Sequence, residues 1–197
     1  MATREAFVQA LRRSAPREVA RPDLAALGVK FPDPAKQFAE VLASVGGACV
    51  RVPDLAAADR AVRELPVCAA ARKVAALVPG VGAATVDLAA VPDPHALEGL
   101  DVAILPGELA VAENGAVWVE GAKLGPHRVV FVVPDHLVLV VDVREVVNDM
   151  HEAYARVVRR PLGYGLFISG PSKTADIEQS LVIGAQGART CTVVLVG

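Results

Sequence analysis

Glycines, hydroxyls and charges gather in residues 170–187, GPSKTADIEQSLVIGAQG, between two apolar stretches that are typical of strands. Gly170 turns the chain, and Ser172 or Thr174 can cap a helix because a hydroxyl accepts a hydrogen bond from a free amide of the first turn. Free amides, hydroxyls and Lys173 are also the chemistry of an anion site. The stretch therefore predicts either a capped helix start or a pocket for a carboxylate or phosphate.

Two acids follow in the same stretch. Asp176 and Glu178 suit the positive end of a helix dipole, but Asp176 would repel a phosphate unless it points away or binds a ribose or substrate hydroxyl. The loop lacks the Walker A pattern, so it does not predict a nucleoside-triphosphate loop. The apolar face of the predicted helix consists of Ile177, Leu181, Gly184 and Ala188.

A second candidate is VAENGAVWVEG, residues 111–121. Asn114-Gly115 between apolar stretches is a strong hairpin signal. Glu113 is then either a solvated turn residue or a carboxylate beside a cleft. In a cleft it could act as a base, or as a nucleophile that forms a mixed anhydride with an acyl group.

The histidines give weaker signals. His127 and His136 flank RVVFVV, an expected strand, and so lie at its opposite ends, where they would not share a metal ion. His127, which follows Gly125 and Pro126, is the better candidate for a site role. His95 and His151 are assigned none.

Composition excludes several classes of protein. The chain has 197 residues, of which 53% are hydrophobic and 4% aromatic, so an aliphatic core is expected. Its net charge of -2, with both signs mixed, gives no footprint for nucleic acid. The charged start does not predict a signal peptide, and apolar runs such as LVLVV are far shorter than the ~20 residues of a membrane span. We expect a cytoplasmic protein.

Cys49, Cys68 and Cys191 stand far apart, and none belongs to a C-x-x-C pair. We therefore expect core cysteines, and no zinc ion or iron–sulfur cluster held by this chain alone.

The predicted elements must position these groups. Residues 1–31 are predicted as a helical arm, begun by Thr3, and a proline-broken linker, and residues 32–197 as one α/β domain. Asp33 and Asp54 each begin a helix. The expected strands are 48–52, 73–79, 99–106, 108–112, 116–120, 127–133, 136–142, 163–169 and 191–196, and the other helices are 144–158 and 170–187.

Most of these strands are continuous Val, Leu and Ile runs, which indicates burial on both faces. The fold class is therefore a three-layer α/β/α sandwich with a mostly parallel sheet, to which the middle hairpin adds an antiparallel portion. In such folds ligands bind beyond the carboxyl ends of strands. The loops to compare are those with Gly80 and Gly82, with residues 113–115, and after residue 169.

The stretch ISGPSKTADIEQSLVIGAQGART, together with the 112–115 turn, the LGPH segment and the valine-rich strands, resembles the LUD-domain proteins, which include the lactate-utilisation protein C group. The resemblance covers nearly the whole chain. It implies a fold similar to the NagB/RpiA/CoA-transferase superfamily. The motif positions of the family correspond to Gly170, Pro171, Ser172, Thr174, Asp176 and Glu178. Thr-Gly is common in the group where this chain has Asn114-Gly115.

The resemblance also implies a role. The chain would be a subunit of a cytoplasmic system, an iron–sulfur L-lactate dehydrogenase complex, that oxidises L-lactate to pyruvate with two iron–sulfur partner proteins and carries no cofactor itself. It would bind a small carboxylate or phosphate-bearing ligand between the Gly170–Asp176 loop and the Glu113–Gly115 turn. Ser172, Lys173 and Thr174 would hold the anion, and Glu113 or His127 would handle a proton.

Two alternatives stay open. Glu-Asn-Gly also resembles the S-E-N-G turn of CoA transferases, in which the glutamate is the nucleophile, although Ala112 replaces the serine here. That favours a stand-alone CoA-transferase-like or phosphosugar-type enzyme using Glu113. The third reading is a non-catalytic assembly subunit whose arm binds the iron–sulfur partners.

Overall fold

A five-stranded parallel sheet forms the centre of the molecule. The computed structural model describes residues 3–14, 20, 22–23, 27–157, 163–175 and 180–197. The strand order is β1-β11-β6-β3-β2, and every neighbouring pair is parallel. The bounds are β1 (Ala48–Val52), β2 (Val74–Ala76), β3 (Val102–Pro106), β6 (His136–Asp142) and β11 (Thr190–Val196). The inner strands are almost wholly buried, as their unbroken apolar runs predict.

A second, mixed sheet has the order β7-β4-β5-β8. Its strands are β4 (Leu109–Val111), β5 (Ala116–Glu120), β7 (Val146–Val147) and β8 (Gly165–Ile168). The hairpin predicted at Asn114-Gly115 is confirmed, since β4 and β5 pair antiparallel and Gly115 has φ +66°. A short antiparallel pair, β9 (Lys173–Thr174) and β10 (Val182–Ile183), follows β8.

The helices begin where the capping residues predict. Thr3, Asp33 and Asp54 accept hydrogen bonds from amides three residues on, at the starts of α1, α2 and α3. The helices are α1 (Arg4–Ser14), α2 (Pro34–Ser44), α3 (Leu55–Glu64), α4 (Pro66–Ala69) and α5 (Met150–Val157), with 3-10 turns η2 (Pro94–Leu97), η3 (Gly121–Lys123), η4 (Arg128–Phe131) and η5 (Val143–Glu145). Among the described helices, none is long and apolar enough to cross a bilayer.

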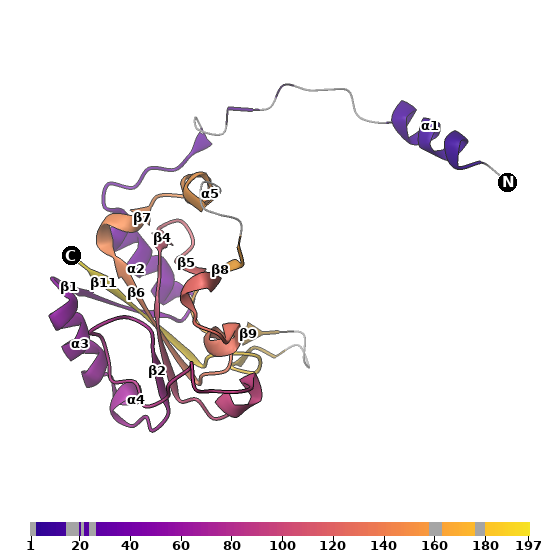
Figure 1. Ribbon diagram of the computed structural model, residues 1–197. Helices are drawn as coiled ribbons and strands as arrows, with labels where there is room; N and C mark the ends of the chain where they lie inside the picture. The colour runs from indigo at the N-terminus through magenta and orange to yellow at the C-terminus, as the bar shows by residue number, and fades with distance from the viewer. Residues whose placement is uncertain (1–2, 15–19, 21, 24–26, 158–162, 176–179) are drawn as a thin grey trace.

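The elements form layers around the central sheet (Figure 1). Ala58 and Val62 of α3 pack on one face of the sheet. Phe38 and Leu42 of α2, with the inner face of the second sheet, pack on the other. The outer face of the second sheet is covered by α5 through Ala153. The predicted α/β sandwich with a mostly parallel central sheet is confirmed.

Three predicted elements are wrong. The helix predicted over 170–187 is replaced by the β9–β10 pair, in which Gly184 has φ +81° and donates its N–H to Ser172. The strand predicted at 127–133 is instead the 3-10 turn η4, which packs Val130 into the core. The helix predicted from residue 144 starts only at Met150, after η5 and β7.

The arm and the domain meet at the residues before α2. α1 has no buried residue. Lys30 forms an ion pair with Glu152, Phe31 donates its N–H to Asn148 Oδ1 (2.9 Å), and the Phe31 ring packs against the core. These contacts fix the point from which the arm leaves; the division at residue 31 stays a prediction.

The cysteines lie in or beside the core, as predicted. All three are free thiols, and burial raises the pKa of Cys49 to about 11, the pKa of Cys191 to about 12 and that of Cys68 above its ordinary value. Since the thiolate is the reactive form, we expect each thiol of the native protein to react with a disulfide reagent at neutral pH far more slowly than free cysteine. In guanidinium, all three should react at the free rate. A native thiol that reacts at the free rate would contradict this burial.

Candidate functional site

The structure brings together two of the three loops that the sequence singles out. Ser169 donates its Oγ–H to the carbonyl oxygen of Asn114 (2.8 Å), which links the end of β8 to the β4–β5 turn. Both segments lie against α2. A Cβ at Gly115 would come within 3.0 Å of the Leu42 backbone, and a Cβ at Gly170 within 2.9 Å of the Val45 carbonyl oxygen. The turn and the loop are therefore packed neighbours.

The loop after β8 lies at the amino-terminal edge of the central sheet. Ser172 donates its N–H to Ala188 (2.9 Å), just before β11, and Gly170 touches Val45, just before β1. The loop therefore follows the carboxyl end of β8 in the second sheet but lies at the amino-terminal ends of the central strands. In the central sheet, the Gly80 and Gly82 loop has the expected carboxyl-end position, because it follows β2.

In its described residues, 170–175 and 180–187, the loop after β8 offers no helix N-terminus to an anion. Residues 173–174 form β9, and the Lys173 ammonium contacts the Val45 carbonyl oxygen at the end of α2. A cation at that position satisfies a helix C-terminus. The anion pocket predicted from helix amides thus loses its geometric basis among the described residues. Thr174 is half-buried in β9, and Asp176 and Glu178 lie outside the described residues.

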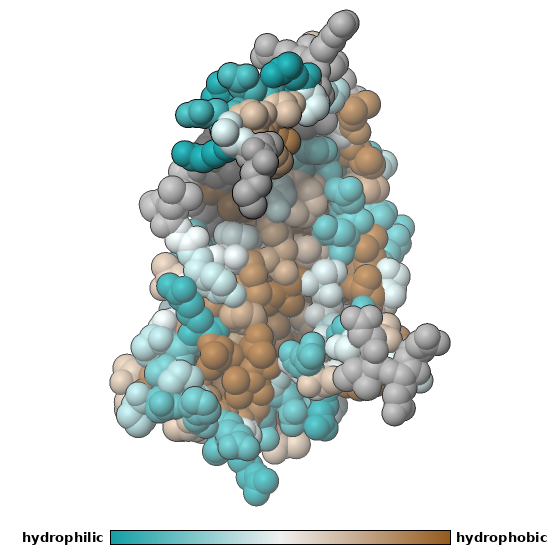
Figure 2. Space-filling view, turned by 90° about the vertical axis from the view of Figure 1, so that its right-hand side faces the viewer, coloured by the Kyte–Doolittle hydropathy of each residue, from teal (hydrophilic) through white to brown (hydrophobic). Residues whose placement is uncertain are grey.

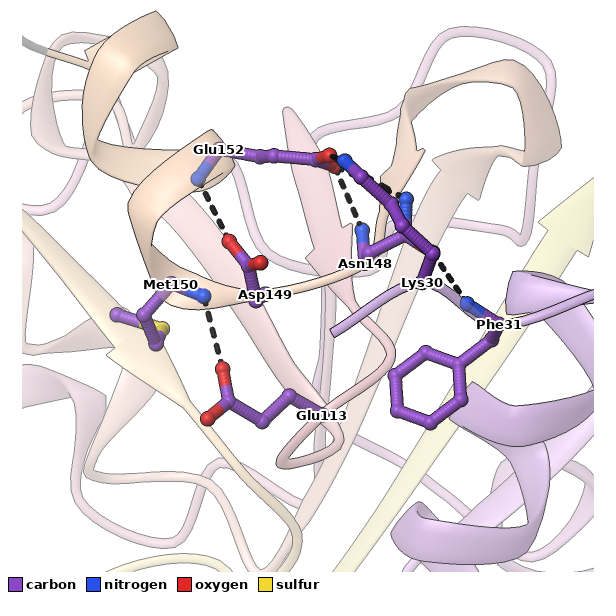
Figure 3. A network of polar contacts seen from close by, with 7 residues as sticks. All are labelled: Lys30, Phe31, Glu113, Asn148, Asp149, Met150 and Glu152. Atoms are coloured by element: carbon purple, nitrogen blue, oxygen red, sulfur yellow. Dashed lines mark hydrogen bonds and ion pairs between the residues drawn. The ribbon is translucent and has the colours of Figure 1, made fainter. Parts of the chain in front are cut away.

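Glu113 points toward the start of α5 (Figure 3). Its Oε2 accepts the Met150 N–H (2.9 Å), and its own N–H donates to the Asn148 carbonyl oxygen (3.0 Å). A carboxylate is favoured beside the positive end of a helix. Glu113 is exposed, and these contacts make it a support for the first turn of α5.

Around that helix start lies a polar network that the sequence reasoning missed. Asp149, only 3% exposed, accepts the Glu152 N–H (2.9 Å). The Glu152 carboxylate in turn accepts the Asn148 N–H (2.9 Å) and pairs with Lys30 (Figure 3). The signal was present, because an aspartate followed three residues later by a glutamate is typical of a capping box.

His127 lies elsewhere. Its Nε2 lies 2.8 Å from the Val91 carbonyl oxygen, and the preceding Gly125 and Pro126 line a different groove, beside Leu77. In the described residues His127 and Glu113 share no contact, so the structure does not join the two predicted proton-handling groups.

A groove of about 260 Å³ opens beside the joined loops. Its walls are mainly apolar, and its polar groups come from Ser169, Ser172 and Gln186. The lining residues are Phe131, Val132, Leu137, residues 166–172 and residues 186–188. β8 and β9 lie on the side that faces the viewer in Figure 2, where apolar side chains form a band down the middle of the surface. We take this groove, called the β8 groove, as the candidate site.

The geometry of the β8 groove favours a small ligand with an apolar part and one polar end. A Cβ at Gly187 would lie 3.1 Å from Ser172 Cβ, so the glycine leaves room beside the hydroxyl. Within the described residues, no group of three or more His, Cys, Asp or Glu side chains is placed to hold a metal ion.

Comparisons with known proteins place the site in a family context. The model of the LUD domain matches residues 94–196, which include both joined loops. "Lactate utilization protein C" of Shouchella clausii is 35% identical over 102 residues, covering 48% of this chain and 44% of that protein. The protein of the same name in Oceanobacillus iheyensis is 27% identical over 106 residues, covering 50% and 45%. Each match thus spans less than half of the relative's length.

A solved structure has a similar fold over most of this chain. The crystal structure of a DUF162 family protein from Deinococcus radiodurans superposes with a TM-score of 0.60, covers 86% of this chain and 99% of that one, and is 20% identical. It supports the fold.

The packing of the joined loops against α2 predicts that alanine at Gly115 lowers the free energy of unfolding more than alanine at Gly80. Gly115 and Gly80 both have positive φ, but only at Gly115 does a Cβ meet backbone, since nothing lies within 4 Å at Gly80. Gly80→Ala should cost only the conformational penalty of roughly 1–2 kcal/mol. Gly115→Ala should cost about 2–4 kcal/mol, because α2 must also shift. Urea unfolding of both variants measures this, and equal losses would show that the turn is not pressed against α2.

Proposed function

This chain belongs to the LUD domain family, and we propose that it is a subunit of a cytoplasmic system that oxidises L-lactate to pyruvate. The family match over residues 94–196 and the relatives named for lactate utilisation support a role in the use of lactate. Because the matches span under half of those relatives, the activity, substrate and partners of the whole system are part of the proposal.

One observation supports the β8 groove as the site of this proposed function. The matched segment contains the β4–β5 turn and the loop after β8, and the Ser169–Asn114 hydrogen bond joins them across 55 residues of sequence. The β8 groove lies beside this junction and combines apolar walls from Phe131 and Leu166 with the Ser172 hydroxyl. L-lactate has a methyl group at one end, which suits the apolar walls, and a carboxylate at the other, which can accept a hydrogen bond from the Ser172 hydroxyl.

The proposed oxidation also requires an acceptor for electrons and protons. Oxidation of L-lactate to pyruvate removes two electrons and two protons, which must pass to an acceptor. We propose that iron–sulfur clusters on partner proteins accept the electrons, so that this chain binds and orients the ligand. Glu113 holds α5, and His127 lies near Val91. The proton-handling roles of both remain predictions.

The first test is a pull-down of the tagged chain from its own cells, with L-lactate oxidation assayed using an artificial electron acceptor. We expect iron–sulfur proteins to co-purify with activity. Ser172→Ala should raise the KM for lactate roughly ten- to a hundredfold, because a hydrogen bond to a charged ligand contributes ~1.5–3 kcal/mol and ~1.4 kcal/mol is a factor of ten. Ser180→Ala, at an exposed serine outside the groove, is the matched control and should leave KM unchanged.

Other outcomes identify the alternatives. Unchanged lactate kinetics in Ser172→Ala would remove the β8 groove from the reaction. Turnover of CoA esters or phosphosugars by the isolated chain, abolished in Glu113→Ala, would replace the proposal with the stand-alone enzyme. Activity that survives both substitutions but disappears when residues 1–31 are deleted, together with the co-purifying proteins, would indicate an assembly subunit.

A further inference from the structure

The N-terminal arm concentrates uncovered apolar surface. Of twelve large apolar side chains that the structure describes as exposed, five lie before residue 30: Phe7, Val8, Leu11, Leu27 and Val29. Phe7 and Leu11 are four residues apart on α1, so they share one helix face, and they are 61% and 54% exposed. The apolar face of α1 is thus left open in the single chain.

α1 needs a partner for a physical reason. It has 11 residues, and isolated helices shorter than ~12–15 residues are marginal in water. Packing of its apolar face would supply the missing stability. Pro16 and Pro22 disfavour an extension of α1 toward the domain. Figure 1 shows α1 standing clear of the domain.

Charge is divided between the arm and the rest of the chain. Residues 1–31 contain six of the 20 basic residues and three of the 22 acidic ones, so the arm carries +3 and the remainder, with 14 basic and 19 acidic residues, carries -5. On α1, Arg12 and Arg13 occupy the last turn. The arm and the body of another copy therefore attract each other.

A groove of the domain offers the complementary surface. It has a volume of about 570 Å³, and Asp87 is its one charged side chain among mostly apolar lining residues: Ala76, Leu77, Ala84, Thr85, Val86, Leu88, Ala89, Gly125 and Pro126. Asp87 is exposed. We call it the β2 groove. It is distinct from the β8 groove, with which it shares no lining residue.

The position of the β2 groove indicates a second copy. The arm is anchored at Lys30 and Phe31 beside α5, near the top of Figure 1, whereas β2 and the chain that follows it lie at the bottom. A tether from Ser14 to Lys30 spans at most roughly 50 Å. For α1 to reach the β2 groove of the same chain, the tether would have to run along the length of the domain. Docking in the groove of a second copy does not require this.

We propose that α1 of one copy docks in the β2 groove of a second copy. Phe7 and Leu11 enter the apolar groove, and Arg12 or Arg13 pairs with Asp87. The exchange is reciprocal, so two arms close a symmetric dimer and leave no open site. The β8 groove is not involved.

The test is the molar mass of the full chain, measured by light scattering and sedimentation across a concentration series. The chain should be dimeric at micromolar concentration. Phe7→Asp with Leu11→Asp should raise the dimer dissociation constant at least a hundredfold. Since both side chains are exposed in the single chain, folding should be unaffected. Leu55→Asp, at an exposed leucine on α3, is the matched control and should leave the dimer intact.

A charge exchange identifies the groove. Asp87→Arg should weaken the dimer, and Arg12→Asp with Arg13→Asp in the same chain should restore it. A chain that stays monomeric at high concentration overturns the proposal, as does a dimer that the Phe7 and Leu11 changes leave intact. Failure of the charge exchange overturns the assignment to the β2 groove. Binding of a monomer to anionic vesicles that depends on Phe7 would assign the arm to a lipid surface instead. None of these results depends on lactate activity.

Discussion

The candidate site depends on close packing between two glycines and one helix. Gly115 and Gly170 come from segments far apart in the sequence, and each lies against the C-terminal half of α2, at Leu42 and Val45. A side chain at either position would meet backbone that cannot move independently. Because both segments approach the same helix, they also approach each other, and the Ser169–Asn114 hydrogen bond becomes available. The position of the β8 groove follows from this packing.

Two charged residues that the sequence predicts for the site, Glu113 and Lys173, stabilise helix ends in the structure. Glu113 holds the first turn of α5, and Lys173 satisfies the end of α2. Each charge lies at the helix end of opposite sign, where it stabilises the helix. The polar residues that line the β8 groove are Ser169, Ser172 and Gln186, beside a mainly apolar wall, and this lining favours recognition of a ligand.

The sequence predicted well wherever a local rule decides the structure. Asp33 and Asp54 cap helices, and the Asn114-Gly115 hairpin and the buried parallel strands are present, because caps, turns and apolar runs act over a few residues. The sequence-based predictions were wrong where contacts between distant segments determine the local structure. Residues 127–133 have strand composition, but they form the 3-10 turn η4 with Val130 packed into the core. For the candidate site, the sequence singled out two segments that the structure brings together, but it did not predict their geometry, because Ser172 bonds to Ala188 and no local rule predicts that pairing.

The layout of the molecule separates two tasks. The β8 groove lies at the amino-terminal ends of the central strands, beside the ends of α2 and β8. The β2 groove lies beside β2, which is an edge strand of the same sheet. The arm leaves from a third place, the network of Lys30, Asn148 and Glu152 at the start of α5. Glu113, in the β4–β5 turn, accepts the Met150 N–H and donates its own N–H to the Asn148 carbonyl oxygen, so the turn is joined directly to the start of α5.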